Sequence, residues 1–226
     1  MAIEGDAADG ASIGILALQG DFAAHGRALA LCGLEAREVR LPRDLAGLRG
    51  LILPGGESTT LLRLMREYGF DEAIPRFAGS GGAIFGTCAG AILLARGVTS
   101  PAQWSLGILD IEVERNGYGR QIESFETELD GVAPELMHAG RPDGTPLPAI
   151  FIRAPRIRRV GPGVTVLASV SGEPVLVRAG RILAATYHPE LTADPRVHRY
   201  FTRAVMPASA PRAPARPAAQ SAPRRA

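Results

Sequence analysis

Short apolar runs alternate with segments of helical pattern through the first half of the chain. Residues 13–18, 36–41 and 50–53 are runs of strand length, and residues 83–85 form a fourth. A helix capped by Asp21 is expected to reach residue 31, and another, capped by Ser58 or Thr59, is expected to reach residue 68. Because strands separated by helices usually pair in parallel, the pattern predicts an α/β domain with a mostly parallel sheet.

The second half of the chain is richer in strands. They are expected at residues 108–114, 125–129, 150–153, 164–170, 174–177 and 182–186. Some of these would be antiparallel additions to the sheet, and a last helix over 195–205 would close the domain.

The two ends of the chain differ from this domain in composition. Residues 1–11 are small and acidic, and we expect a flexible leader. Residues 207–226 mix Pro, Ala, Arg and Ser without apolar periodicity, which predicts a disordered tail. The residues between these ends, 12–206, are expected to form one folded domain.

Charge and hydropathy exclude several classes of protein. The net charge is +2, but the tail contains four arginines and no acidic residue, so the rest of the chain is slightly acidic. We therefore expect no nucleic-acid partner. No apolar run spans a bilayer and no basic segment opens a secretory signal, so we expect no membrane association and a cytoplasmic location.

The two cysteines, Cys32 and Cys88, are read separately because a disulfide is unlikely in a reducing compartment. Cys88 lies in residues 86–90 (GTCAG), between an apolar strand and an apolar helix. A sharp strand-to-helix turn needs small neighbours, exposes a nucleophile, and directs helix amides at the sulfur, which favours the thiolate. The alternative for Cys88 is a small buried apolar residue. Cys32 lacks such a turn, and we interpret it as a packing residue of the core or the surface.

A histidine and a carboxylate follow the last predicted strand. A thiolate that attacks an amide needs a general acid for the leaving nitrogen and a third group to orient that acid. His188 and Glu190 are two residues apart in extended chain, so both can project to the same side. The order of nucleophile, histidine and acid differs from that of α/β-hydrolases. The pair could also ligate a metal, but no third ligand with suitable spacing occurs nearby.

Two backbone amides are candidates for binding the oxyanion that forms during such an attack. The amide of Ala89 follows the nucleophile directly. Gly56 lies in residues 54–58 (PGGES), after a strand of the sheet, where ligands of open α/β sheets bind. By itself this loop could be merely a strand-to-helix turn.

These features resemble class I glutamine amidotransferases, and several further stretches narrow the resemblance. They are residues 16–21 (LALQGD), 54–60 (PGGESTT), 114–116 (ERN), 119–121 (GRQ), 124–126 (SFE) and 151–155 (FIRAP). Over about residues 13–205 the chain is similar to the glutaminase subunits of pyridoxal 5'-phosphate synthase.

The resemblance implies a flavodoxin-like α/β fold, an open and mostly parallel sheet with helices on both faces. It implies a catalytic triad of Cys88, His188 and Glu190 that hydrolyses L-glutamine to glutamate and ammonia. The glutamine contacts implied are Gly56, Glu57, Ser58, Arg115, Ile152 and Arg153. A guanidinium and a carboxylate or carbonyl suit the zwitterionic ligand, although Arg115 and Arg153 could equally be surface residues.

The resemblance also implies a partner and excludes bound cofactors. Ammonia would pass to a synthase subunit of (β/α)8-barrel fold that makes pyridoxal 5'-phosphate, and this chain would bind no cofactor and no metal. The free subunit would be poorly active until the synthase docks. We expect docking on the helix that follows residues 19–21, with a contribution from His25.

Three other functions are considered. An amidotransferase of nucleotide, histidine or aminobenzoate synthesis is disfavoured by residues 19–21 (QGD) and 55–58 (GGES). Related small cysteine hydrolases and stress proteins usually have histidine after the cysteine, where this chain has Ala89. A regulatory subunit that only binds the synthase is disfavoured by an intact triad.

Overall fold

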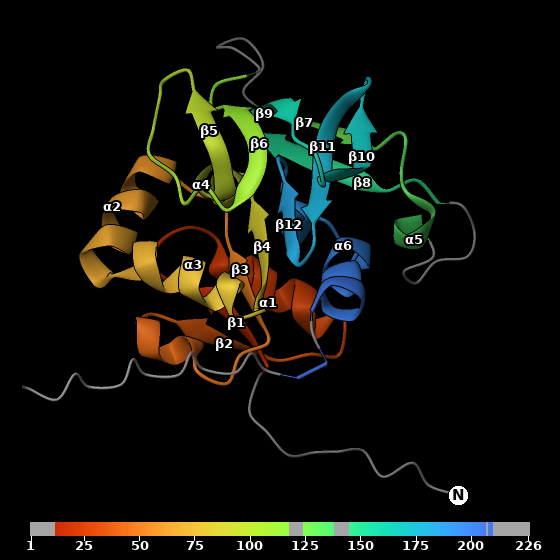
Figure 1. Cartoon of the computed structure of the whole chain (residues 1–226). Coiled ribbons are helices and arrows are strands. Elements are labelled where there is room, and N and C mark those ends of the chain that lie inside the picture. Colours follow the sequence, from red (N-terminus) through yellow and green to blue (C-terminus); the bar gives the residue numbers. More distant parts are fainter. Residues whose placement is uncertain (1–11, 118–123, 138–144, 207, 210–226) are drawn as a thin grey trace, which may run out of the picture.

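The computed structural model describes residues 12–117, 124–137, 145–206 and 208–209. The expected leader and nearly all of the expected tail lie outside these ranges, so both stay predictions. Figure 1 shows a central sheet between helices, with smaller sheets beside one of its ends.

The central sheet has seven strands in the order β10-β11-β12-β4-β3-β1-β2. Their bounds are β1 Ile13–Leu16, β2 Ala36–Val39, β3 Gly50–Leu53, β4 Ala83–Thr87, β10 Thr165–Val170, β11 Glu173–Ala179 and β12 Ile182–Ala185. The five strands from β12 to β2 are parallel, whereas β10 and β11 pair antiparallel. The predicted parallel sheet with antiparallel additions is confirmed.

Helices cover both faces of this sheet (Figure 1). The helices are α1 Phe22–Ala30, α2 Ser58–Tyr68, α3 Phe70–Gly79, α4 Ala89–Leu94, α5 Pro134–Met137, α6 Arg196–Tyr200, and the π-helical turn η3 Phe201–Val205. Side chains alternate along β3, so Leu51 and Leu53 join one apolar core with residues of α2, α3 and α4. Ile52 joins the other core, with residues of α1, α6 and η3. In the described part of the chain no helix is long and apolar enough to cross a membrane.

Two smaller sheets lie near the carboxyl end of β4 (Figure 1). One contains β5 Ala95–Thr99, β6 Leu109–Glu114 and β9 Arg156–Val160, and the other pairs β7 Ser124–Glu128 with β8 Pro148–Ile152. The short helical turns are η1 Pro42–Leu45 and η2 Pro189–Leu191. β8 reaches the site directly, because Ile150 O accepts a hydrogen bond of 2.8 Å from the His188 amide.

The structure differs from the expected elements in one helix cap and in several elements that were not expected. The expected strands and helices are present within a few residues of their predicted ends, but α3, α5, β5 and β9 were not predicted. The cap of α2 was wrong: Glu57, not Ser58 or Thr59, is the N-cap residue. Its longer side chain accepts hydrogen bonds from the amides of Thr59 at 3.0 Å and Thr60 at 2.7 Å.

Candidate active site

Cys88 forms the sharp turn between β4 and α4. Its φ of 47° and ψ of −103° are unusual for a residue with a side chain and cost about 1–3 kcal/mol. The neighbouring glycines are required by space: a Cβ on Gly86 would lie 2.7 Å from the backbone of Gly90, and one on Gly90 would meet the Leu53 carbonyl. The strained turn with small neighbours is therefore confirmed. The expected exposure is wrong, because Cys88 is only 6% exposed and lies at a cavity wall.

The pairing of β12 with β4 brings His188 to the cysteine. Ala185 is in register with Thr87, and the Cys88 amide donates a hydrogen bond of 2.8 Å to Ala185 O. Since parallel strands end at the same edge, the residues that follow β12 emerge beside the turn after β4. Both residues line the same cavity, and a Cβ on Gly55 would be in close contact with the two side chains at once.

His188 is held and charged by its neighbours. Its Nδ1 lies 2.7 Å from Glu190 Oε1, and the Glu190 side chain is fully buried. Burial of the ring opposes its charged form, but contact with the Cys88 thiol and the Glu190 carboxylate raises the pKa of His188 to about 10. At neutral pH the imidazole is therefore protonated and can act as a general acid.

The loop after β3 packs directly on these two residues. A Cβ on Gly55 would lie 3.1 Å from His188 Nδ1 and 3.3 Å from Cys88 Cβ. Gln19 braces the next residues, because its Oε1 accepts a hydrogen bond of 3.1 Å from the Glu57 amide. Gly56 has a φ of 153°, and a Cβ there would meet the Gln19 side chain.

A cavity of about 210 Å³ opens beside Cys88. It is lined by Gly56, Glu57, Ser58, Cys88, Ile92, Arg115, Asn116, Ile152, Arg153 and His188. All six residues expected to contact glutamine are among them. Ala89 and Glu190 are buried and are not lining residues, whereas the lining residues Ile92 and Asn116 were not assigned from the sequence. Asn116 was present in the ERN stretch, whereas Ile92 had no signal beyond its place in an apolar helix.

Two charged residues of the cavity lining, Arg115 and Glu57, interact with each other. Arg115 Nη2 lies 3.1 Å from Thr59 Oγ1 and 3.7 Å from Glu57 Oε1. Partial burial opposes ionisation of Glu57, yet the amides of Thr59 and Thr60 lower its pKa to about 2. The cavity therefore presents a cation and an anion side by side.

Ile152 and Arg153 also line the cavity. Ile152 O lies 4.0 Å from Cys88 Sγ, and Arg153 has a φ of 42°. The Ser58 hydroxyl donates a hydrogen bond of 3.1 Å to Gln103 Oε1.

His25 is not where we expected it. It is 0% exposed and lies among His198, Thr87 and Glu190, so it cannot contact a docked protein. A polar residue on a helix is usually exposed, but packing of α1 against η2 and α6 turns His25 inward.

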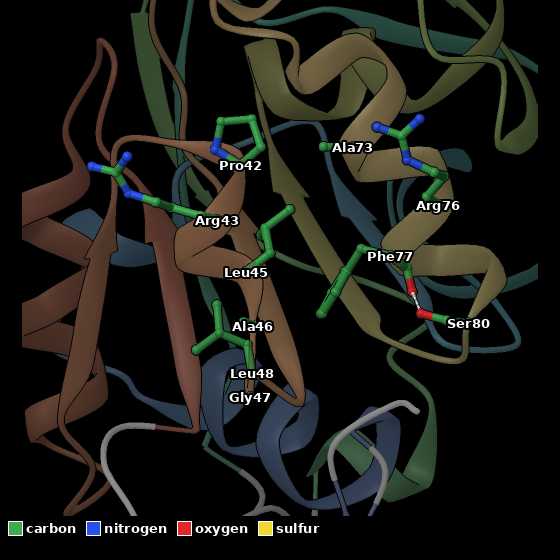
Figure 2. A pocket seen from close by; sticks show the side chains of 10 residues that line it. All are labelled: Pro42, Arg43, Leu45, Ala46, Gly47, Leu48, Ala73, Arg76, Phe77 and Ser80. Atoms are coloured by element: carbon green, nitrogen blue, oxygen red, sulfur yellow. Dashed lines mark hydrogen bonds between the residues drawn. The ribbon is translucent and has the colours of Figure 1, made fainter. Parts of the chain in front are cut away.

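A larger cavity, of about 450 Å³, lies between η1 and α3 and shares no lining residue with the cavity beside Cys88. Figure 2 shows that its walls are mainly apolar, with Arg43 and Arg76 at the rim. Its one hydroxyl, on Ser80, donates to Phe77 O at 2.9 Å. Without a base beside that hydroxyl the cavity has no means of amide chemistry. In the described residues no group of His, Cys, Asp and Glu is arranged to hold a metal ion.

Comparison with known proteins agrees with this geometry. The profile of the SNO glutamine amidotransferase family matches residues 15–207. A protein of Thermus thermophilus named pyridoxal 5'-phosphate synthase subunit PdxT is 55% identical, over 84% of this chain and 95% of its own length. The protein of that name from Solibacter usitatus is 53% identical, over 84% and 96%. A crystal structure described as a glutamine amidotransferase superposes with a TM-score of 0.75 at 51% identity, over 84% of this chain and 96% of the other. The chain belongs to the SNO glutamine amidotransferase family, and its fold is that of the class I glutamine amidotransferases.

Proposed function

We propose that this protein is the glutaminase subunit of a pyridoxal 5'-phosphate synthase and that Cys88, His188 and Glu190 carry its reaction. The observation that carries the proposal is one small cavity that is lined both by Cys88 and His188 and by the neighbouring pair of Arg115 and Glu57. Its volume of about 210 Å³ is below the roughly 300–1,000 Å³ of drug-sized ligand sites and suits an amino acid.

The reaction begins with the thiolate of Cys88. It attacks the side-chain amide carbon of glutamine, the carbonyl electrons move to oxygen, and the backbone amides of Gly56 and Ala89 stabilise the oxyanion. When the oxyanion collapses, the carbon–nitrogen bond breaks and protonated His188 gives its proton to the departing ammonia. A glutamyl thioester on Cys88 remains.

Water completes the cycle. Neutral His188 takes a proton from water, and the hydroxide attacks the thioester carbon through a second oxyanion at the same site. Collapse releases glutamate and the Cys88 thiolate, and His188 is again protonated. Glu190 stabilises the charged imidazole throughout, because its Oε1 lies 2.7 Å from Nδ1.

Recognition of glutamine uses the charges on its α-carbon. Arg115 binds the α-carboxylate, and Glu57 faces the α-ammonium, so the neighbouring pair matches a zwitterion. Ser58, Ile152 and Arg153 complete the contacts that position the side-chain amide near Cys88. An ester or amide that lacks these two charges would bind poorly.

The partner is inferred from the two named relatives. We propose that ammonia passes to a synthase subunit of (β/α)8-barrel fold, that both proteins are cytoplasmic, and that docking raises the glutaminase rate. Neither a metal nor a cofactor takes part in the glutaminase step.

The test is a glutaminase assay with and without the synthase subunit from the same organism. We expect stoichiometric glutamate and ammonia, a faster rate with the synthase, and no measurable rate for Cys88→Ala. The matched control is Cys32→Ala, which removes the other free thiol and should keep the wild-type rate. A Cys88→Ala variant as active as wild type would refute the proposed mechanism.

A further inference from the structure

A second histidine contacts the candidate triad from inside the protein. His25, on α1, has no solvent exposure. Its Nε2 lies 3.1 Å from Thr87 Oγ1 and 3.6 Å from Glu190 Oε1. Its Nδ1 lies 3.0 Å from Nε2 of His198, on α6. Thr87 directly precedes Cys88, and Glu190 Oε1 is also the atom that binds His188.

The hydrogen-bond network determines where the protons of these two rings lie. Burial lowers the pKa of His25, and burial together with His25 lowers the pKa of His198 to about 3, so both rings are neutral at neutral pH. Only one of them can donate across the 3.0 Å contact. Within the described structure His198 Nδ1 has no hydrogen-bond partner.

Only one of the two possible arrangements avoids a buried, unpaired N–H. In one arrangement, His25 donates its Nδ1 hydrogen to Nε2 of His198. The hydrogen of His198 is then on its Nδ1, which has no partner among the described residues. Nε2 of His25 carries no hydrogen in this arrangement, and its lone pair faces the Glu190 carboxylate. A buried donor without an acceptor costs about 1–3 kcal/mol, and the lone pair would repel the carboxylate. In the opposite arrangement His198 donates from Nε2 to His25 Nδ1, and His25 carries its hydrogen on Nε2, toward Thr87 and Glu190.

We propose that His25 is a positioning residue of the glutaminase site: its Nε2 hydrogen binds Thr87 and supports the Glu190 carboxylate, while His198 fixes its tautomer. The inference rests on the proposed function, because Glu190 matters only if His188 is the acid and base. His25 does not touch glutamine and acts through Glu190.

The chemistry gives a reason for a neutral histidine at this place. Glu190 Oε2 has no hydrogen-bond partner among the described residues, so Oε1 carries most of the stabilisation of this buried carboxylate. At 3.6 Å, His25 acts on it as an oriented dipole, since the distance is too long for a strong hydrogen bond. A neutral ring supports the anion without competing with the His188 imidazolium for its charge. Burial favours the uncharged acid, yet the hydrogen bond and charge of the His188 ring keep the pKa of Glu190 below its ordinary value.

The first test compares two substitutions at this position with the synthase present. His25→Leu fills similar space but removes the donor, whereas His25→Gln can present an amide N–H near the former Nε2. We expect kcat of His25→Leu to fall at least about 10-fold with little change in KM, and His25→Gln to return to within about threefold of wild type. A role in packing alone predicts lower stability for both variants and an unchanged kcat per folded molecule.

Ile74→Ala is the matched control for stability. Ile74 is fully buried in α3, away from the site, and the truncation should cost about 2–5 kcal/mol. Urea unfolding gives the folded fraction of each variant. Ile74→Ala should keep the wild-type kcat per folded molecule. If His25→Leu also keeps it while wild type is active, the inference is wrong and the proposed function stands. A wild type without glutaminase activity would overturn both.

The second test does not need a folded variant. Nitrogen-15 NMR of the wild-type imidazoles should show His25 as a neutral ring with its hydrogen on Nε2. A charged ring, or a hydrogen on Nδ1, would overturn the proposed role.

Discussion

Gly55 tests whether activity depends on the position of the His188 ring. Its backbone is not in the left-handed region, so alanine is strained there only by its methyl group. That methyl would lie 3.1 Å from His188 Nδ1 and about 1 Å inside ordinary contact distance of Cε1. The ring must therefore retreat by about 1 Å, which can cost about 100-fold in rate, or about 2.7 kcal/mol of barrier. We expect Gly55→Ala to lower kcat by about that factor.

The assay is glutamine hydrolysis with the synthase present, scaled by the folded fraction from urea unfolding. Overpacking in Gly55→Ala should also cost about 1–3 kcal/mol of stability. Gly79→Ala is the matched control, because a Cβ at this last residue of α3 meets nothing within 4 Å. It should keep the wild-type kcat and gain up to about 1 kcal/mol of stability. A kcat for Gly55→Ala within about twofold of wild type would refute the reasoning.

Three further substitutions test the charged groups of the site. Glu190→Gln should lower kcat at least about 100-fold. His188 would lose the carboxylate that helps raise its pKa to about 10, so the alkaline limb of the pH–rate profile should move to lower pH. An unchanged pH–rate profile would exclude this role of Glu190. Arg115→Ala should raise KM for glutamine about 10- to 100-fold with a smaller effect on kcat, since it removes a charged hydrogen bond of about 1.5–3 kcal/mol; an unchanged KM would contradict it. Glu57→Gln should lower the free energy of unfolding at pH 6, where the wild-type carboxylate is ionised. The difference between variant and wild type should shrink as the pH falls from 4.5, the ordinary pKa of the Glu57 carboxyl, to about 2, its pKa in the folded protein. Urea unfolding at pH 6 and pH 3 checks this, and a difference that grows in acid would show that Glu57 is not stabilised as the anion.

The parts of the fold that were predictable are those whose pattern is local. All four residues of β3 are buried, which makes the strand a continuous apolar run. β9 reads RIRRV and buries only Ile157, and β5 reads ARGVT and contains a glycine. Strands this polar have no signature of their own and form because neighbouring strands pair with them. The helix α3 was not predicted because it contains Pro75, and proline usually interrupts a helix. The buried residues of α3 are otherwise spaced as in a helix.

The same distinction applies to the site. The turn at Cys88 and the pair of His188 and Glu190 could be predicted because each depends on residues adjacent in the chain. The cap of α2 was assigned to Ser58 or Thr59 instead of Glu57, since glutamate is not a common N-cap residue. The buried position of His25 could not be predicted from the sequence, because its contact with His198 joins residues that are 173 positions apart. Only the packing of α1 against η2 and α6 creates it.

Cys88 is the proposed nucleophile that attacks the glutamine amide, and its reactivity can be measured directly. A chloroketone analogue of glutamine, incubated with the protein and the synthase, should alkylate the nucleophilic sulfur, and peptide mass spectrometry would identify the residue. We predict one label per chain on Cys88, none on Cys32, and protection by glutamine. A label on Cys32 alone, or an unlabelled Cys88 in a preparation that the analogue inactivates, would contradict the account.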